Sequence, residues 1–353
     1  MTKRTVIVVG AGIAGCTIAY ELASRGFDVT VLEASAEVAS GASGNDVGII
    51  YPRLEAAWTK AMDFYIQGLE ATLALLKRLS SAHCIFERTG IIRFAKDDED
   101  VRRLQKIIEL LSQKVPNLVE FLDTNVIKDV GITCSTKGAI FINQVGYVRP
   151  KILCSTLIRD VSTLYNHKVY KVEYRGGVWV VHCDFLGSLR QLECTILVFA
   201  NAYYASHIEQ LQFLEPMLRR VRGQISLIQA TECSAGLKTV LCGLNGYITP
   251  SVEGWHYVGA NYDYHNLSTE PDIAGENHNR QIWCNYFGKE SCLKLAVLPG
   301  RASIRCVSKN RMPIIGPLEQ FSNLYVSIGH GSRGMISGPI AAKMIAEYIR
   351  PLA

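Results

Sequence analysis

The feature that most constrains this chain is a glycine-rich turn placed between an apolar strand and a helix. Residues 5–9 (TVIVV) form the continuous apolar run of a buried parallel strand. Residues 10–15 (GAGIAG) follow with GxGxxG spacing, and residues 13–25 carry apolar side chains at helical intervals before Gly26. The three glycines permit a tight turn, the approach of a pyrophosphate to the backbone, and close packing of helix against strand. The pattern therefore predicts a dinucleotide site at a helix N-terminus.

An acidic residue at the end of the next strand narrows the choice of nucleotide. A second apolar strand, residues 28–32, ends at Glu33, whose carboxylate could accept both ribose hydroxyls of an adenosine. An acid at this place disfavours a 2′-phosphate, so FAD or NAD is preferred over NADP. The segment 39–45 (ASGASGN) could wrap backbone and hydroxyl donors around a flavin nucleotide, or it could be a flexible surface loop. Composition alone leaves both interpretations open.

The pattern beyond this unit predicts an α/β protein with two sheets. Amphipathic helices are expected at 58–79 and 99–115, and Gly176–Gly177 marks a hairpin turn. Further strands are expected at 139–142, 168–174, 177–183, 192–199, 218–228, 238–242, 246–250, 255–262 and 323–328, and further helices at about 277–288 and 334–349. The second sheet is expected to be largely antiparallel and inserted between parts of the nucleotide domain.

Composition excludes several other classes of protein. The 353 residues are 48% hydrophobic and 20% charged, which is typical of a globular protein. A net charge of +5 is too small for a dedicated nucleic-acid binder, although it permits an acidic partner. The eleven cysteines stand singly without zinc-ligand spacing, so we expect no metal site and reduced thiols, most of them in the core. The apolar stretch 5–20 is too short for a membrane span and glycine-interrupted unlike a signal peptide, so a cytoplasmic protein is expected.

Several longer blocks carry a family resemblance. They are GASGNDVGIIYPRL (41–54), VRGQIS (221–226), GYITP (246–250), VGANY (258–262), IRCVSKNRMPIIG (304–316) and HGSRGMISGPIAAKMIA (330–346). Together with the glycine turn and Glu33, they resemble the D-amino-acid-oxidase-like family of FAD enzymes, which includes glycine and sarcosine oxidases. Within that family the chain is similar to the FAD-dependent half of bifunctional tRNA wobble-uridine modification proteins. The blocks follow family order from residue 5 to 348, and GASGN with YP and the GSRG block are the most specific.

The resemblance implies an FAD-binding Rossmann-type domain interleaved with a substrate domain that is built on a largely antiparallel sheet. FAD-binding segments are expected at 1–85, 146–215 and 311–353, and substrate-domain segments at 86–145 and 216–310. FAD would be bound non-covalently. Some sarcosine oxidases attach flavin through a cysteine, but the spacing of Cys306 does not match, and we expect Cys306 to pack in the core.

The resemblance also implies a reaction and its partners. The substrate would be 5-carboxymethylaminomethyl uridine, or its 2-thio form, at the wobble position of tRNA. Oxidation of the carboxymethylamine and hydrolysis of the imine would give 5-aminomethyl uridine and glyoxylate, with molecular oxygen reoxidising the flavin. The bifunctional proteins carry a preceding methyltransferase domain, whereas the first strand here begins at Thr5, so later methylation would require a separate protein. A glycine, sarcosine or D-amino-acid oxidase and a non-catalytic tRNA-binding flavoprotein are the alternatives.

Matched position by position, the resemblance assigns roles to individual residues. Arg305 matches the arginine that forks onto a substrate carboxylate, and Tyr247 a tyrosine that could donate to the same group; a surface arginine and a sheet-face tyrosine are the alternatives. The amides of 329–335 would face the flavin's pyrimidine end, Val169 would meet the adenine, and 200–202 would lie beside the pyrophosphate. His330 on its own is more typical of a structural histidine than a catalytic one. The predicted cofactor-binding set is Gly10, Ala11, Gly12, Ile13, Ala14, Gly15, Glu33, Ala39, Ser40, Gly41, Ala42, Ser43, Gly44, Asn45, Gly48, Val169, Ala200, Asn201, Ala202, Arg305, Gly329, His330, Gly331, Ser332, Arg333, Gly334 and Met335.

A tRNA substrate would also need contacts to its phosphates. Two local clusters of basic residues could rim the pocket and hold the anticodon stem. They are Arg219, Arg220 and Arg222, and Arg301, Lys309 and Arg311. A solvated charged face is the alternative for each of these residues.

Overall fold

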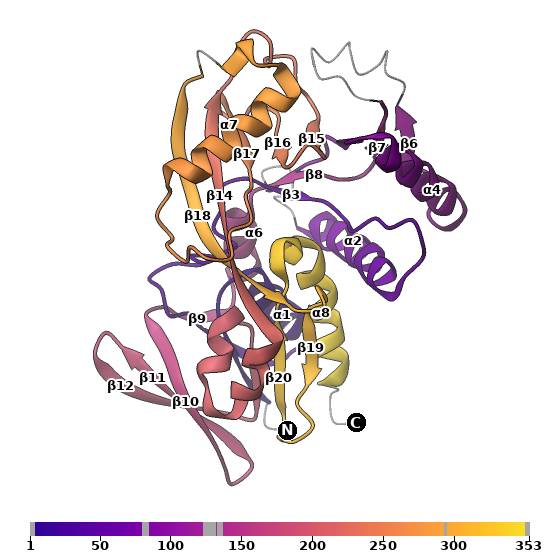
Figure 1. Cartoon of the computed structure of the whole chain (residues 1–353). Coiled ribbons are helices and arrows are strands. Elements are labelled where there is room, and N and C mark those ends of the chain that lie inside the picture. The colour runs from indigo at the N-terminus through magenta and orange to yellow at the C-terminus, as the bar shows by residue number, and fades with distance from the viewer. Residues whose placement is uncertain (1–3, 80–84, 123–131, 133–136, 293–294, 350–353) are drawn as a thin grey trace.

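A mainly parallel sheet is built around the glycine-rich turn and lies in the lower part of the molecule as drawn in Figure 1. The computed structural model describes residues 4–79, 85–122, 132, 137–292 and 295–349. The strand order is β19-β20-β13-β1-β2-β9, and every neighbouring pair is parallel except β19 and β20. The strands are β1 (Thr5–Val9), β2 (Asp28–Leu32), β9 (Ser162–Leu164), β13 (Ile196–Phe199), β19 (Ile314–Pro317) and β20 (Leu324–Ile328).

Strand β1 is buried on both faces because its side chains alternate between two hydrophobic clusters. Val6 and Val8 pack into the cluster that includes side chains of α1 (Ile13–Ser24), α2 (Lys60–Arg78), α6 (Pro150–Leu157) and α8 (Gly334–Tyr348). Ile7 and Val9 pack on the other face, against the sheet β10 (His167–Arg175), β11 (Val178–Phe185) and β12 (Ser188–Cys194) and the 3-10 helices Ala202–His207 and Glu209–Met217. Burial on both faces explains why the strand reads as an unbroken apolar run.

The second sheet forms the upper part of Figure 1 and has the order β18-β14-β17-β16-β15-β5-β7-β6. All neighbouring pairs are antiparallel except β15 and β5. Its strands are β5 (Ile91–Phe94), β6 (Val119–Leu122), β7 (Ala139–Ile142), β14 (Leu218–Gln229), β15 (Val240–Cys242), β16 (Tyr247–Ile248), β17 (Trp255–Gly259) and β18 (Val297–Ser308). Helix α7 (Ile273–Phe287) packs on the β14–β17 end, and α4 (Asp98–Lys114) packs beside β6 and β7.

A third, small sheet consists of β3 (Gly48–Ile50), β8 (Gly146–Val148) and β4 (Phe86–Glu87). Two further 3-10 turns lie at Glu290–Cys292 and Gly331–Arg333. Strands of the parallel sheet and of the eight-stranded sheet alternate along the sequence, so the chain passes between the two layers several times. The predicted fold class, a Rossmann-type domain interleaved with a largely antiparallel sheet, is confirmed. The segment boundaries at 85, 145, 215 and 310 stay a prediction.

The elements differ from the sequence predictions in several places. The strand expected at 192–199 is two strands of different sheets, β12 and β13, because the chain turns at Thr195, whose backbone and hydroxyl donate to Thr5 O. Helix α7 begins at Ile273, not 277, because Asp272 caps it by accepting from Gly275 N at 2.7 Å. Strand β18 was not predicted at all.

The cysteines correct one expectation. Cys284 and Cys292 form a disulfide, so the prediction of reduced thiols is wrong for this pair. Of the cysteines in the described residues, Cys16, Cys154, Cys183, Cys194 and Cys306 are free and buried, as expected for small core side chains; two further positions, 84 and 134, lie outside those residues. No helix in the described part of the chain is long and apolar enough to cross a membrane.

Candidate active site

A cavity of about 1280 Å³ opens at the carboxyl ends of the parallel strands. Val9, Leu32, Ala200 and Ile328, which end or directly follow β1, β2, β13 and β20, contribute to its wall. The facing wall comes from β5, β16, β17 and β18 of the eight-stranded sheet. Pockets for drug-sized ligands span about 300–1,000 Å³, so this cavity has room for an extended dinucleotide and a further ligand.

The glycine turn has no space for side chains. A Cβ on Gly10, whose φ is +102°, would lie 2.9 Å from the Cα of Asn201, and a Cβ on Gly15 would overlap the carbonyl oxygen of Gly10. Gly12 caps α1 and faces the Ser43 hydroxyl, which accepts from Ile13 N at 3.0 Å. Asn201 Oδ1 is buried and has no hydrogen-bond partner among the described residues. A glycine turn without side chains leaves room for a pyrophosphate, and the unused Asn201 acceptor could accept from a ribityl hydroxyl.

Glu33 lines the cavity at the end of β2 and is already held by the backbone. Its Oε2 accepts from Ala11 N at 2.7 Å and its Oε1 from Ser35 N at 2.9 Å. Each carboxylate oxygen keeps a further lone pair, so both ribose hydroxyls of an adenosine could still be bound. Val169 and Lys168 lie at the same end of the cavity, where a register shift in β10 follows Val169.

Nearly all of the predicted cofactor-binding residues line the cavity. Four do not and lie behind its wall: Ala11, Gly15, Ala39 and Gly44. Each has a packing role, because Ala11 O accepts from Ala39 N, Gly15 packs on Gly10, and Gly44 packs on the carbonyl of Ala39. These four residues shape the turn and the loop but do not line the space in which a ligand would lie.

The loop 39–45 is fixed by Arg301 rather than left flexible. The Arg301 guanidinium donates to the carbonyls of Ser40 and Gly41 and to Asn45 Oδ1, the last at 3.3 Å. Arg301 was predicted as a candidate tRNA contact, and the structure corrects that prediction. Burial lowers the pKa of this guanidinium, which reflects how deeply it is enclosed by the loop.

A second predicted tRNA contact is also wrong. Arg222 is fully buried and donates to the carbonyls of Ser268 and Glu270 at 2.9 and 2.7 Å, with an ion pair to Asp272 at 3.1 Å. It therefore fastens the segment 261–272 to β14. Arg219, Arg220, Lys309 and Arg311 are exposed, as the phosphate-contact hypothesis requires, although Arg220 stacks on Tyr203 with its Cζ 4.8 Å from the ring centre.

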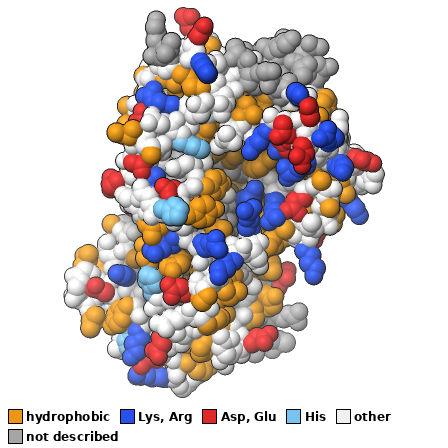
Figure 2. All heavy atoms as spheres, viewed as in Figure 1, with side chains coloured by type: hydrophobic (Ala, Val, Ile, Leu, Met, Phe, Trp, Pro, Cys, Tyr) orange, Lys and Arg blue, Asp and Glu red, His pale blue; other side chains and the backbone are white. Residues whose placement is uncertain are grey.

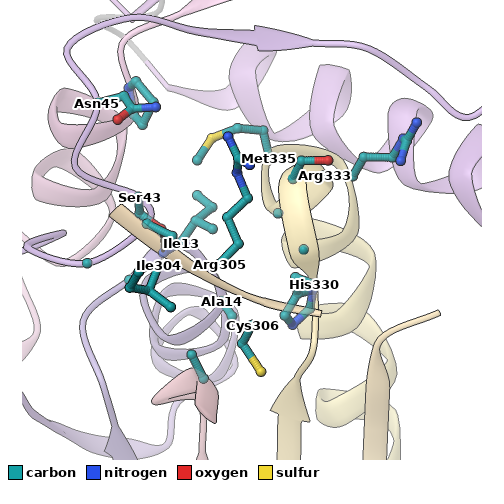
Figure 3. A pocket seen from close by; sticks show the side chains of 18 of the residues that line it. Ile13, Ala14, Ser43, Asn45, Ile304, Arg305, Cys306, His330, Arg333 and Met335 are labelled. Atoms are coloured by element: carbon teal, nitrogen blue, oxygen red, sulfur yellow. Dashed lines mark hydrogen bonds between the residues drawn. The ribbon is translucent and has the colours of Figure 1, made fainter. Parts of the chain in front are cut away.

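The turn 329–335 lies between β20 and α8 and carries His330, a half-buried histidine that lines the cavity (Figure 3). His330 Nε2 and Nδ1 lie 3.0 Å from Ser327 Oγ and 2.8 Å from Ser337 Oγ. Burial lowers the pKa of His330 to about 4, so the ring is neutral at physiological pH. Both ring nitrogens are occupied by serine hydroxyls, which supports the structural interpretation of this residue.

Arg305 projects from β18 into the centre of the cavity (Figure 3). Its Cζ lies 4.8 Å from the Tyr262 ring centre, and Nη1 donates to Asn261 O at 3.2 Å. No carboxylate of the described residues forms an ion pair with it. Tyr247 lines the same region, and burial raises its pKa to about 12 although the Arg305 charge opposes the shift. A protonated hydroxyl beside an unpaired guanidinium is suited to a carboxylate ligand.

Sequence reasoning missed three functional candidates in the facing wall. Arg93 comes from β5, lines the cavity and forms an ion pair with Asp100 at 2.6 Å. Tyr51 lies beside it, and burial raises the Tyr51 pKa to about 12. Tyr262 covers Arg305 and donates to Ser332 Oγ at 3.3 Å. Tyr51 and Tyr262 stand in the YP and VGANY blocks, whereas β5 was not predicted, so Arg93 had no sequence signal.

Cys306 packs in the core as predicted. It is buried in the hydrophobic cluster behind the parallel sheet, and burial raises its pKa to about 12. A thiol in this state is a poor nucleophile.

A cavity that joins a Rossmann-type cradle to an unpaired arginine on an antiparallel sheet is the arrangement of a flavin-dependent oxidoreductase. The chain belongs to the DAO family, described as FAD dependent oxidoreductase, whose model matches residues 5–348. It is thus an FAD-dependent oxidoreductase with FAD as its cofactor.

Two curated relatives are "tRNA 5-methylaminomethyl-2-thiouridine biosynthesis bifunctional protein MnmC" of Stutzerimonas stutzeri and the protein of the same name from Pseudomonas syringae pv. tomato. Each is 30% identical over 98% of this chain and 56% of the relative, so the chain spans about half the length of the curated relatives it matches. Among solved structures, glycine oxidase from Geobacillus kaustophilus has a TM-score of 0.84 at 18% identity, covering 98% of this chain and 95% of that chain. L-proline dehydrogenase from P. horikoshii has a TM-score of 0.81 at 18% identity, covering 98% and 93%. These likenesses show the fold.

Proposed function

We propose that this enzyme oxidatively removes the carboxymethyl group from 5-carboxymethylaminomethyl uridine, or its 2-thio form, at the tRNA wobble position. The observation that carries the proposal is Arg305, a cation of the cavity interior with no carboxylate partner among the described residues, beside the protonated hydroxyl of Tyr247. The names of the 30%-identical relatives place those proteins in the biosynthesis of 5-methylaminomethyl-2-thiouridine in tRNA. A carboxymethylated precursor of that nucleoside would carry a glycine-like group for Arg305. The net reaction consumes water and molecular oxygen and yields 5-aminomethyl uridine, glyoxylate and hydrogen peroxide.

The cofactor supplies the redox chemistry, because bound FAD accepts the hydride lost from the carbon next to the amine nitrogen. The chain's own residues bind and orient. Arg305 would fork onto the substrate carboxylate, and Tyr247 would donate to the same group. Tyr262, stacked on the guanidinium, restrains Arg305 in one position. No side-chain base is required, since the amine needs only to be neutral when the hydride leaves.

The cofactor site would be formed by the turn 10–15, Glu33, the loop 39–45 and the turn 329–335. Glu33 would accept from the ribose of the adenosine, and the α1 N-terminus would face the pyrophosphate. The amides that begin α8 would face the flavin's pyrimidine end. FAD would be held without a covalent bond, since Cys306 lines the cavity but burial raises the pKa of its thiol to about 12, which makes it a poor nucleophile.

A free amino acid would satisfy the same arginine and tyrosine, so glycine, sarcosine or a D-amino acid is the second candidate substrate. The two candidates are separated by anaerobic flavin reduction. Purified holoenzyme is mixed with an anticodon stem-loop that carries the modified uridine, and separately with glycine and sarcosine, while the flavin absorbance is followed. Bleaching by the stem-loop alone is the expected result. Bleaching by the free amino acids alone would overturn the proposal, and tight stem-loop binding without bleaching would indicate a non-catalytic flavoprotein.

The arginine assignment has its own test. Arg305→Met should retain the flavin absorbance spectrum but lose nearly all flavin reduction by the stem-loop. Arg175→Met, at an exposed arginine of the β10–β11 hairpin, is the control for charge removal and should reduce normally. Near-normal reduction by Arg305→Met would show that the carboxylate is bound elsewhere.

A further inference from the structure

The cavity is unevenly charged along its length. Among the described residues that line the cavity, Glu33 is the only acidic one. Lys168 lies at the same end of the cavity as Glu33. The half that faces the eight-stranded sheet carries Arg93, Lys96, Arg305 and Arg333, without an acid among the described lining residues. Figure 2 shows Lys and Arg side chains gathered beside the hollow in this face of the molecule. This half of the cavity therefore favours an anionic ligand.

The four cations differ in how they are neutralised. Arg93 forms an ion pair with Asp100 through both terminal nitrogens, at 2.6 and 3.0 Å. Arg305 is the candidate for a substrate carboxylate. Arg333 has no ion pair among the described residues, and its Nε is buried without a hydrogen-bond partner there. An uncompensated guanidinium of this kind is costly unless a ligand supplies the missing acceptor.

Arg333 and Arg305 point to different places. In Figure 3 the Arg333 side chain extends away from Arg305, and its Cζ lies 5.7 Å from the centre of the Tyr65 ring on α2. Lys96 is exposed at the cavity. Cys242 pairs with Arg93 of β5, Lys96 follows that strand, and these residues line the same cavity as Arg333. Burial raises the pKa of the Cys242 thiol, and the charges of Arg93, Arg333 and Lys96 oppose that shift. Arg333 and Arg305 therefore point into different parts of the cavity.

We propose that Arg333 and Lys96 form a second anion subsite, which binds a phosphate group of the nucleotide that carries the modified base. The inference rests on the proposed function and deepens it. A free glycine or sarcosine has one anionic group and would leave Arg333 unpaired, whereas a nucleotide brings a carboxylate and a phosphate. Guanidinium and ammonium groups both bind phosphate oxygens, and the planar guanidinium can do so through two parallel hydrogen bonds.

The test compares ligands that differ only in the phosphate. Binding of uridine and uridine 5′-monophosphate to the holoenzyme is measured by calorimetry, and kcat/KM is measured for the modified nucleoside and its 5′-monophosphate. The wild-type enzyme should prefer the phosphorylated ligand about 10- to 100-fold in both assays, as expected for a charge-assisted contact. The preference should weaken as salt is raised.

Variants then assign the preference to residues. Arg333→Gln should bring the nucleotide-to-nucleoside ratio close to one, Lys96→Gln should lower it less, and Arg333→Lys should restore part of it. Arg102→Gln, at an exposed arginine of α4, is the matched control and should keep the ratio. Should Arg333→Gln fail to fold, Lys96→Gln and Arg333→Lys still decide the matter.

The outcomes separate this inference from the proposed function. If neither modified ligand reduces the flavin but uridine 5′-monophosphate binds through Arg333, the proposed function fails and the phosphate subsite stands. If the modified nucleoside and nucleotide are oxidised equally well, or if the Arg333→Gln and Lys96→Gln variants keep the preference, the subsite is refuted and the proposed function stands.

Discussion

Gly223→Ala would displace the candidate carboxylate-binding arginine without removing it. Gly223 lies on β14, opposite Ser303 of β18, and its φ does not require glycine. A Cβ added here would overlap Cζ, Nη1 and Nη2 of Arg305, all of which would lie well inside the 3.4 Å of an ordinary contact. The strand backbone is held by neighbours on both sides, so the guanidinium must retreat by about 1 Å or more.

The displacement should affect binding much more than folding. The guanidinium would lose its contact with the Tyr262 ring and the hydrogen bond to Asn261 O, which together stabilise the fold by about 1–2 kcal/mol. Alanine offsets part of this loss, because it lowers the entropy of the unfolded chain relative to glycine. A charge-assisted bond to a carboxylate is worth about 1.5–3 kcal/mol, so kcat/KM should fall about 10- to 100-fold.

The assay pairs urea unfolding with anaerobic flavin reduction by the modified stem-loop, in wild type, Gly223→Ala and the control Gly236→Ala. A Cβ on Gly236 meets open space, so the control should behave as wild type. The expected result for Gly223→Ala is a normal flavin spectrum, an unfolding free energy within about 1 kcal/mol of wild type, and a raised KM. An unchanged kcat/KM would refute the role given to Arg305.

Three further predictions concern folding and the cofactor. Gly15→Ala should give flavin-free or insoluble protein, because its Cβ would overlap the Gly10 carbonyl, a backbone atom that cannot swing aside; recovery of a normal flavin content would contradict the predicted turn. Arg222→Met should lower the unfolding free energy by about 3 kcal/mol in urea and expose the segment 261–272 to protease, whereas Arg219→Met, at the exposed neighbour, should cost less than about 0.5 kcal/mol. Burial lowers the pKa of His330 from 6.5 to about 4, so its full contribution to the free energy of unfolding is present above pH 6.5. As the pH drops towards 4, this contribution falls by at most about 3 kcal/mol, because the unfolded chain binds a proton that the folded chain does not bind. His330→Gln should therefore flatten the loss of stability between pH 6.5 and 4 in urea titrations, and an equally steep loss would show that other groups cause it.

The nucleotide half could be predicted from the sequence because its determinants are local. The turn 10–15 and Glu33 belong to one β-α-β unit of about thirty residues, and the backbone N–H of Ala11 binds the Glu33 carboxylate directly. Apolar side chains on both faces of β1 gave the same prediction independently. The substrate half required the family resemblance, since nothing near Arg305 in the sequence distinguishes a ligand-binding arginine from an exposed one.

Strand β18 was missed because its sequence does not read as a strand. Pro299, Gly300 and Arg301 interrupt the alternation, and the structure accommodates them in a bulge opposite Ile225 and Ser226. β18 is an edge strand, where a proline need not donate to a neighbour. The prediction that Arg222 and Arg301 contact tRNA failed for a different reason. Arg222 and Arg301 are enclosed by segments about 46 and 260 residues away in the sequence, and no local pattern reveals that a charged side chain will be covered by such a partner.

The distribution of charge along the cavity explains how it could bind an anionic cofactor and an anionic substrate at separate positions. The pyrophosphate of a dinucleotide would be met by backbone amides at the α1 N-terminus, where the described lining residues place no arginine. Side-chain guanidinium groups stand instead at the other half, on β5, β18 and the turn before α8. The backbone amides of the glycine turn are suited to a pyrophosphate, whereas the side chains of Arg305 and Arg333 are suited to single carboxylate or phosphate groups of a substrate. A free amino acid would use one of these two arginines, whereas the proposed nucleotide substrate would use both.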